Sequence, residues 1–251
     1  MIEFAITYLS MLLIIWARYI LFSGIFWAAI WGRPEEKVGG TRLAKIRPPG
    51  KTMWREAKTS MAVSLIYAVP AAVLIHMWKQ GGTAIYNDWS MVRDIIWAPI
   101  SLLIYLALHD TYFYWTHRGM HHPKLYAATH QTHHLSKQPT PWAAFSFHPW
   151  EAVISAWFIP ALAFVIPMHI GVFLFLLTLM TFNAVANHSG WEIWPKRFLD
   201  GPLGRHLITA RHHNLHHTRF QRNYGLYFRF WDRWMGTDDM SGDPMGAAKK
   251  A

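Results

Sequence analysis

Four long apolar stretches alternate with polar segments in this sequence. They cover residues 4–31, 61–78, 95–115 and 152–187. An α-helix needs about 20 apolar residues to cross a bilayer, so each of the first three stretches can cross once. Pro160 and Pro167 interrupt the fourth stretch, which can form two short crossings as a hairpin, or a re-entrant pair. We therefore expect an all-α, polytopic membrane bundle with about four membrane-crossing or re-entrant segments.

The composition supports a membrane protein and excludes several classes of site. Hydrophobic residues make up 53% of the chain and charged residues only 15%, against about 25% charged in an ordinary soluble domain. The chain contains no cysteine, which excludes disulfide scaffolds, thiolate-bound iron–sulfur clusters and thiol nucleophiles. The net charge of +10 fits an anionic membrane surface. Because of the apolar stretches, we prefer this interpretation to nucleic-acid binding.

The distribution of basic residues predicts the orientation in the membrane. Residues 33–60 carry eight basic residues together with several prolines and glycines, whereas residues 79–93 carry only two basic residues. We expect 33–60 to be a cytoplasmic loop, by the positive-inside rule, within an N-terminal transmembrane region that covers residues 1–104. The segment 238–251 is expected to be a flexible, solvated tail.

Histidines are concentrated in one half of the chain. Of the 16 histidines, all except His76 lie between residues 109 and 217. Eight of them form one H-x3-H and two H-x2-H-H clusters, namely His117 and His121, then His130, His133 and His134, and finally His213, His216 and His217. On a helix, positions i, i+3 and i+4 share a face, so each cluster is expected to direct its imidazoles at one point. Eight neutral imidazoles suit two metal ions, held in a helical cap at the cytoplasmic surface.

Three other residues are candidates for supporting roles. His188 is a plausible ninth ligand, and His148 suits either a role beside the metals or plain packing. Asp110 lies two helical turns before His117, where its carboxylate could fix the tautomer of a ligand imidazole or be a helix-end charge. If the histidines before and after residues 152–187 share one site, that segment must cross the membrane an even number of times, or not at all.

The histidine clusters alone leave the chemistry open between hydrolysis, oxygen activation and metal transport. A zinc-dependent membrane lipid hydrolase would normally need an acid/base carboxylate beside the metal-bound water, and carboxylates are scarce near the clusters. A histidine-rich metal transporter would need polar residues along the membrane helices, and these are almost absent. A pair of ions bound only by nitrogen is better suited to a redox metal such as iron.

The motifs of the C-terminal half resemble those of the fatty acid hydroxylase superfamily. Within it they are most similar to the sterol desaturase (sterol C5-desaturase-like) branch of membrane non-haem di-iron enzymes. The resemblance covers roughly residues 105–237. It is carried by HDTYFYWTHRGMHHPKLYAATHQTHH (109–134), PTPWAAFSFHPWEA (139–152), NHSG (187–190) and HHNLHHTRFQRNYGLYFRFWDRWMGT (212–237).

This resemblance implies a di-iron catalytic domain over residues 105–237 that includes the membrane hairpin 152–187. It implies that the eight cluster histidines bind two iron ions, with His188 as a further ligand, and that the protein uses O2 to hydroxylate or desaturate a membrane lipid. We see no fused haem domain, so electrons are expected from a separate ferredoxin, or from cytochrome b5 with its reductase. No nucleic-acid partner is expected.

Overall fold

Four long helices dominate the computed structural model, which describes residues 1–89 and 91–245. They are α1 (Ile2–Phe26), α2 (Gly50–Lys79), α3 (Met91–Met120) and α8 (Ile170–Asn187). All four are long and apolar enough to cross a membrane, and a short π-helical turn, Trp27–Trp31, extends the first. At most 39% of any crossing segment is buried within the protein. Most of their apolar side chains therefore face outward, as in lipid-facing helices, and the expected all-α membrane bundle is confirmed.

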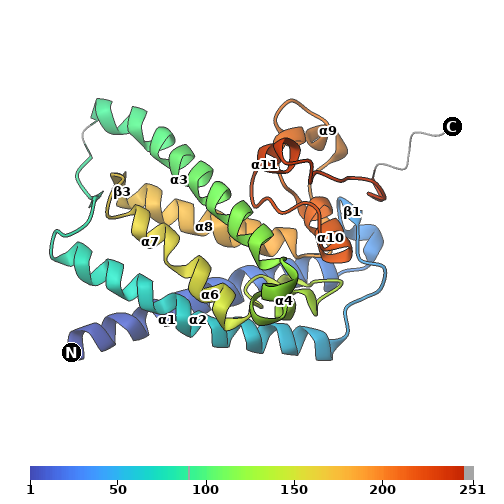
Figure 1. Ribbon diagram of the computed structural model, residues 1–251, viewed down its shortest axis with the longest axis horizontal. Helices are drawn as coiled ribbons and strands as arrows, with labels where there is room; N and C mark the ends of the chain where they lie inside the picture. Colours follow the sequence, from blue (N-terminus) through green and yellow to red (C-terminus); the bar gives the residue numbers. More distant parts are fainter. Residues whose placement is uncertain (90, 246–251) are drawn as a thin grey trace.

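The long helices run back and forth between two ends of the molecule (Figure 1). Helices α1 and α2 pack against each other, and α3 and α8 return to the end that holds α4 and α10. We call this the metal end, because the histidine clusters lie there, and we call the opposite end, with the N-terminus and β3, the distal end. The apolar core near the distal end contains Tyr105, Met168 and Leu176, and a second core packs Trp31 and Val185 near the metal end.

The segment 152–187 forms a hairpin with unequal arms. The outgoing arm is broken into α6 (Pro149–Ala156) and α7 (Phe158–Leu162), and the returning arm is the single helix α8. Strand β3 (Met168–His169), at the turn, pairs in parallel with β2 (Ile85–Tyr86), which follows α2. The hairpin thus reaches the distal end and comes back, so the histidines on both sides of it lie at the same end, as the parity argument requires.

Short elements cover the metal end. They are α4 (Pro123–Thr129), α5 (Gln131–His134), α9 (Lys196–Leu199), α10 (Ala210–Arg219), α11 (Phe230–Trp234), the 3-10 turns Glu35–Lys37, Pro141–Ala143 and Gly204–His206, and the antiparallel strands β1 (Thr41–Arg42) and β4 (Trp191–Glu192). The loop that contains Pro141 is fastened to the membrane helices. Tyr19 and Ser60 both donate to the carbonyl of Trp142, and Ser23 donates to that of Pro141.

The predicted loop 33–60 is shorter than expected. Helix α2 begins at Gly50, directly after Pro48 and Pro49, so Arg55 and Lys58 are helical. Proline restricts the residue before it to extended backbone but is well tolerated at the start of a helix. The proline pair therefore marks the start of a helix here, and the polar residues 51–60 extend the apolar helix beyond its membrane-crossing part.

The prediction of a flexible tail from residue 238 was also wrong for the residues that the structure describes. The buried carboxylate of Asp243 pairs with Arg211 at 3.3 Å, and Asp239 pairs with Arg219. Asn223 exchanges two hydrogen bonds of 2.8 Å with the backbone of Asp239. These contacts anchor residues 237–245 to the cap. Residues 246–251 of the predicted tail lie outside the described residues.

Candidate metal centre

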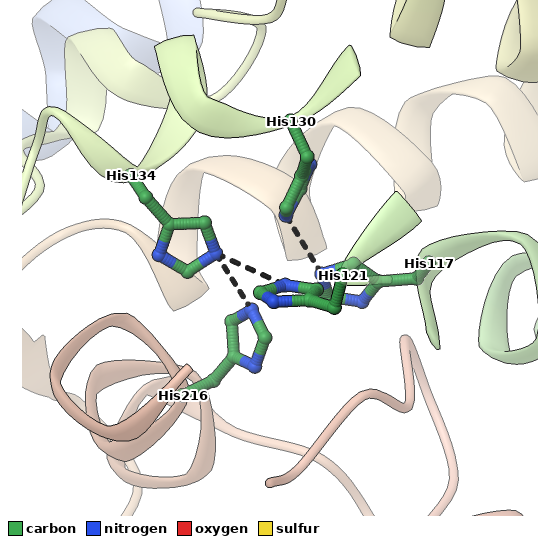
Figure 2. A group of neighbouring side chains, drawn as sticks. All are labelled: His117, His121, His130, His134 and His216. Carbon is green, nitrogen blue, oxygen red and sulfur yellow. Dashed lines mark hydrogen bonds between the residues drawn. The ribbon is translucent and has the colours of Figure 1, made fainter. Parts of the chain in front are cut away.

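Nine histidines gather into two groups at the metal end. Within each group the ring nitrogens all lie within 4.8 Å of one another. We name the first group site A; it contains His117, His121, His130, His134 and His216, and is drawn in Figure 2. We name the second group site B; it contains His133, His188, His213 and His217. All nine predicted ligands are thus brought together, including His188, which belongs to none of the three histidine clusters.

The local fold explains why these rings converge. His117 lies in the last turn of α3 and His121 follows its end, while α10 carries the third cluster. His188 directly follows α8, where the chain turns through Gly190. That glycine has a φ of +71°, and a Cβ there would lie 3.2 Å from both Ala44 and Trp31. Only glycine fits this close approach, which explains the NHSG sequence.

The two H-x2-H-H clusters do not each converge on one point, as the sequence analysis expected. In the second cluster His130 and His134 belong to site A, whereas His133 belongs to site B. The third cluster is divided in the opposite sense. Here the i and i+4 residues belong to site B, and the i+3 residue, His216, belongs to site A.

Helix geometry accounts for this division. Successive residues on an α-helix are about 100° apart, so i and i+4 differ by only about 40° whereas i+3 and i+4 diverge by about 100°. The side chains of residues i and i+4 therefore point to one site, and the side chain of residue i+3 points to the neighbouring site. As a result the two sites lie side by side, with ring centroids of His134 and His217 4.9 Å apart.

Hydrogen bonds at Nδ1 fix several rings so that Nε2 faces the site. The Nδ1–H of His117 donates to the carbonyl of Tyr224 at 2.9 Å, and that of His216 to the carbonyl of Arg222 at 2.7 Å. The Nδ1–H of His188 donates to the carbonyl of Ala184 at 2.6 Å. A neutral imidazole that donates from Nδ1 carries its lone pair on Nε2, so these three rings present metal-binding atoms to the interior.

The Nε2 atoms approach one another closely. In six pairs of rings, three within each site, the Nε2 atoms are 2.8–3.3 Å apart. A ring nitrogen with a lone pair attracts only a donor or a cation, and the carbonyl contacts already occupy the proton of several of these rings. The donor set therefore fits two metal ions, one in each site.

Burial keeps the imidazoles in their metal-binding form. Desolvation, together with the neighbouring histidines, lowers the pKa of His121 to about 2 and that of His134 to about 3, and burial lowers the pKa of His188 to about 4. The pKa values of the other ligands beyond the membrane helices also fall well below 6.5 because their rings are buried. These rings are neutral at pH 7 and need not lose a proton before they bind a metal.

This burial predicts acid sensitivity of the metal-free protein. An unfolded chain protonates its histidines near pH 6.5, but the folded apoprotein resists protonation of His188 until about pH 4, because burial lowers its pKa. Between these values the unfolded state binds more protons than the folded state. As the pH decreases from 6.5 toward 4, the free energy of unfolding therefore falls by about 1.4 kcal/mol per pH unit for each such histidine. We expect the melting temperature of the apoprotein in detergent to drop steeply from pH 7 to pH 5. An equal melting temperature at both pH values would contradict this.

Asp110 does not contact a ligand imidazole, in contrast to one interpretation of the sequence. Its Oδ1 accepts the backbone N–H groups of Leu226, Tyr227 and Phe228 at 2.6–3.2 Å. The carboxylate of Asp232 accepts from the backbone of Tyr224 in the same loop. Both carboxylates hold the loop whose Tyr224 carbonyl orients His117.

Replacement of Asp110 by alanine should therefore destabilise the protein. Three backbone N–H groups, one buried and two partly buried, would lose their acceptor, at a cost of about 1–3 kcal/mol for a buried group left unsatisfied. We expect a total loss near 3 kcal/mol in the free energy of unfolding, measured by thermal melting in detergent. Asp110→Asn keeps an acceptor oxygen and should lose less. Glu36→Ala, an exposed carboxylate, is the control and should change stability by less than about 0.5 kcal/mol.

The other predicted supporting residue, His148, lies outside both sites. Its Nδ1 accepts the backbone N–H of Trp150 at 3.3 Å and so caps the start of α6. Instead the next turn supplies a carboxylate that the sequence analysis did not assign, Glu151, whose Oε1 lies 2.8 Å from Nδ1 of His130. In the sequence Glu151 only follows His148 and Pro149 closely. Its contact with His130 could not be predicted, because His130 lies 21 positions earlier.

One pocket reaches the site from outside. It has a volume of about 490 Å³ and is lined by Trp115, Arg118, Gly119, His121, His122, Gln221, Arg222, Tyr224 and Thr237. Aromatic rings cover other faces of the centre, with Phe220 packed on His134 and Phe147 packed on His133. The pocket is therefore an opening from the surface to a ligand of site A, whereas these two ligands are shielded by apolar rings.

Comparison with known proteins identifies the family of this fold and site. The family model named fatty acid hydroxylase matches residues 102–237, more than half of the chain and every residue of both sites. The chain belongs to the fatty acid hydroxylase family. Similarity to curated members of sterol metabolism supports the sterol desaturase branch.

This fatty acid hydroxylase family member is similar to several curated relatives. It is 34% identical over 144 residues to a delta(7)-sterol 5(6)-desaturase of Gibberella zeae, which is 56% of this chain and 42% of the relative. It is 33% identical over 172 residues to lathosterol oxidase of Rattus norvegicus, covering 68% and 56% of the two chains. The chain thus spans about half the length of these relatives. No solved structure matches it. Membership of this family and four apolar helices make it an integral membrane protein.

Proposed function

We propose that this protein is a membrane-bound, di-iron, O2-dependent oxidoreductase that hydroxylates or desaturates a lipid. The observation that carries the proposal is the pair of adjacent sites, with five and four histidines and converging Nε2 atoms. The relatives are named sterol desaturases and lathosterol oxidases, so a sterol is the first lipid to test, ahead of fatty acyl chains and polar lipids.

Iron bound at sites A and B would supply the oxidising power for cleaving an unactivated C–H bond with O2. Hydroxylation converts a C–H bond, O2, two electrons and two protons into an alcohol and water. Desaturation consumes the same reagents, removes two neighbouring hydrogens as an alkene forms, and yields two waters. The residues of this chain hold the ions, keep the imidazoles neutral and shield the centre with apolar rings such as Phe147 and Phe220.

The hydrolytic alternative receives no support from the site. A zinc hydrolase needs a carboxylate positioned toward a metal-bound water. Among the described residues, the carboxylate in contact with a ligand is Glu151, and it lies behind His130, at Nδ1, away from the converging Nε2 atoms. Metal transport would need a path of polar side chains through the membrane, and the apolar windows of the described helices contain at most two charged residues each.

The proposed location of the metal centre is the cytoplasmic side of the membrane. The segment between α1 and the apolar part of α2, at the metal end, carries eight basic residues. The connection at the distal end, between α2 and α3, carries far fewer. By the positive-inside rule, this asymmetry supports a cytoplasmic metal end, from which a soluble electron carrier can reach the site.

Lipid analysis with labelled oxygen tests the proposed function. Cells that express the wild type, His216→Ala or the exposed control His206→Ala are grown under ¹⁸O2, and their lipids are compared by mass spectrometry. We expect wild type and control, but not His216→Ala, to produce a lipid that has gained one labelled oxygen or lost two hydrogens. Identical lipids in all three strains, or a product that forms without O2, would refute the proposal.

A separate electron-transfer protein, such as a ferredoxin or cytochrome b5 with its reductase, is the proposed reductant. The pocket beside His121 supports a docking position for it. Arg118 and Arg222 line this pocket, and neither has a carboxylate partner among the described residues. Two such arginines beside a ligand of site A complement an acidic carrier.

Charge reversal at this pocket should slow electron delivery. For Arg118→Glu and Arg222→Glu we expect turnover with an acidic protein donor to fall about 10-fold at low salt, because electrostatic steering is lost. Turnover with dithionite should be unchanged. Lys196→Glu, on an exposed helix that does not line the pocket, is the control with the same charge change. A raised KM for the lipid with an unchanged donor dependence would instead assign the arginines to the substrate headgroup.

A further inference from the structure

A buried carboxylate contacts only one of the nine histidines. Glu151 lies in the first turn of α6, and its Oε1 is 2.8 Å from Nδ1 of His130. The side chains are only 4% and 1% exposed, respectively. Among the described residues, no other Asp or Glu lies within ion-pair distance of a histidine of either site.

His130 is oriented with one ring nitrogen toward site A and the other toward Glu151. Its Nε2 lies 2.9 Å from Nε2 of His117, within site A, so Nδ1 is the atom that faces the carboxylate. The N–H direction is not in line with Oε1, and the contact is an ion-pair approach rather than an aligned hydrogen bond. The second oxygen, Oε2, is buried without a hydrogen-bond partner.

The remaining ligands lack such a charge. His117, His216 and His188 each donate from Nδ1 to a neutral backbone carbonyl. The Nδ1 atoms of His133, His134 and His217 are buried without a hydrogen-bond partner. Site A therefore combines five imidazoles with a buried carboxyl group behind one of them, whereas site B has four imidazoles and no such group among the described residues.

We propose that Glu151 is a positioning residue that makes the two metal positions unequal. Its carboxylate lies 2.8 Å from Nδ1 of His130 and so favours the tautomer that carries the proton on Nδ1 and the lone pair on Nε2, toward the metal, which makes that ligand more basic. When a metal cation occupies site A it favours the ionised form of Glu151, and this negative charge stabilises the higher charge of an oxidised ion, so that site A binds metal more tightly and has a lower reduction potential than site B. Because Glu151 lies in the first turn of α6, it also connects the outgoing arm of the membrane hairpin to site A.

Metal titration of the purified, full-length apoprotein tests this inference. Anaerobic additions of Co²⁺ are followed by its visible absorption for the wild type, Glu151→Ala, Glu151→Gln and Glu56→Gln. Glu56 is a matched control, because it is a fully buried glutamate with one side-chain partner, Thr140, and one unpartnered oxygen, and it touches no ligand. We expect two unequal binding steps in the wild type and in Glu56→Gln.

The two Glu151 variants separate orientation from charge. Glu151→Ala should weaken the tighter step about 10–100-fold, as is typical when a carboxylate behind a ligand histidine is removed. Glu151→Gln keeps an acceptor oxygen and should rescue most of this affinity, but the iron-loaded variant should show a raised potential for one ion in a spectroscopic redox titration. If Glu151→Ala does not fold, the potential of the Gln variant decides.

Two equal binding steps in the wild type, or a Gln variant with unchanged affinity and unchanged potentials, would overturn the inference. It rests on the proposed function only in taking iron as the native metal. The two proposals can fail separately. Unequal Co²⁺ binding that depends on Glu151, without any lipid oxidation, would refute the function alone. Lipid oxidation with metal binding and potentials indifferent to Glu151 would refute this inference alone.

Discussion

Alanine at His133 and alanine at the adjacent His134 are expected to remove different metal ions. His133 belongs to site B and His134 to site A, so each variant should retain about one iron per chain. Loss of a ligand should exceed the roughly 10–100-fold effects typical of groups behind the ligands, and we expect lipid oxidation to fall by more than about 100-fold in both. Iron per chain and turnover of the purified proteins are the measurements.

Double variants make this prediction sharper. His134→Ala with His216→Ala removes two ligands of site A and should leave the ion of site B in place. His133→Ala with His216→Ala also removes two histidines, but one from each site. This variant should leave neither ion tightly bound. The exposed His206→Ala serves as control for the loss of a histidine. Equal iron contents in the two double variants would contradict the division into sites A and B.

Removal of iron is expected to abolish lipid oxidation completely, and only a redox-active metal should restore it. Chelation under reducing conditions empties both sites, and Fe²⁺ added without O2 should recover activity once O2 and reductant are supplied. Zn²⁺ should fill the same imidazoles, because it prefers nitrogen ligands as well, but it has no redox chemistry. The protein loaded with Zn²⁺ should therefore be folded and inactive.

The same experiment distinguishes the two classes of enzyme. Occupancy is measured as metal per chain, and folding by melting temperature in detergent, so that inactivity of the zinc form is not confused with unfolding. Binding to the folded state raises the melting temperature, and both metals should do so. Product formation by the zinc form, or by the iron form in the absence of O2, would contradict an oxygen-dependent reaction and favour hydrolysis.

The sequence predicts the membrane helices and the nine histidines of the site, but not how these histidines divide between sites A and B. The length of the apolar stretches alone predicts the crossing helices, because the thickness of the bilayer requires about 20 apolar residues in a helix that crosses it. The division of each H-x2-H-H cluster was missed, because shared helical faces were taken to mean a shared metal. The 100° between neighbouring residues sends His133 and His134 to different sites, but choosing the ion for each requires the positions of α3, α8 and α10.

Contacts between residues far apart in the sequence could not be predicted, for a different reason. The role of Asp110 depends on a loop 116 or more positions later, and that of Glu151 on the orientation of one imidazole. Likewise, the polar residues after Gly236 have a composition typical of a free tail. They pack because Arg211 and Arg219 lie opposite their carboxylates, and no local pattern encodes that pairing.

Because the histidines of α5 and α10 are divided between sites A and B, the pitch of these helices sets the spacing between the two sites. In α5 and in α10, neighbouring residues on a single turn belong to opposite sites, so each short helix would set the distance between two bound ions. A shift of either helix would move one ligand of both ions at once. A change in the ligands of one site would therefore also change those of the other, and two bound ions would respond as a single unit.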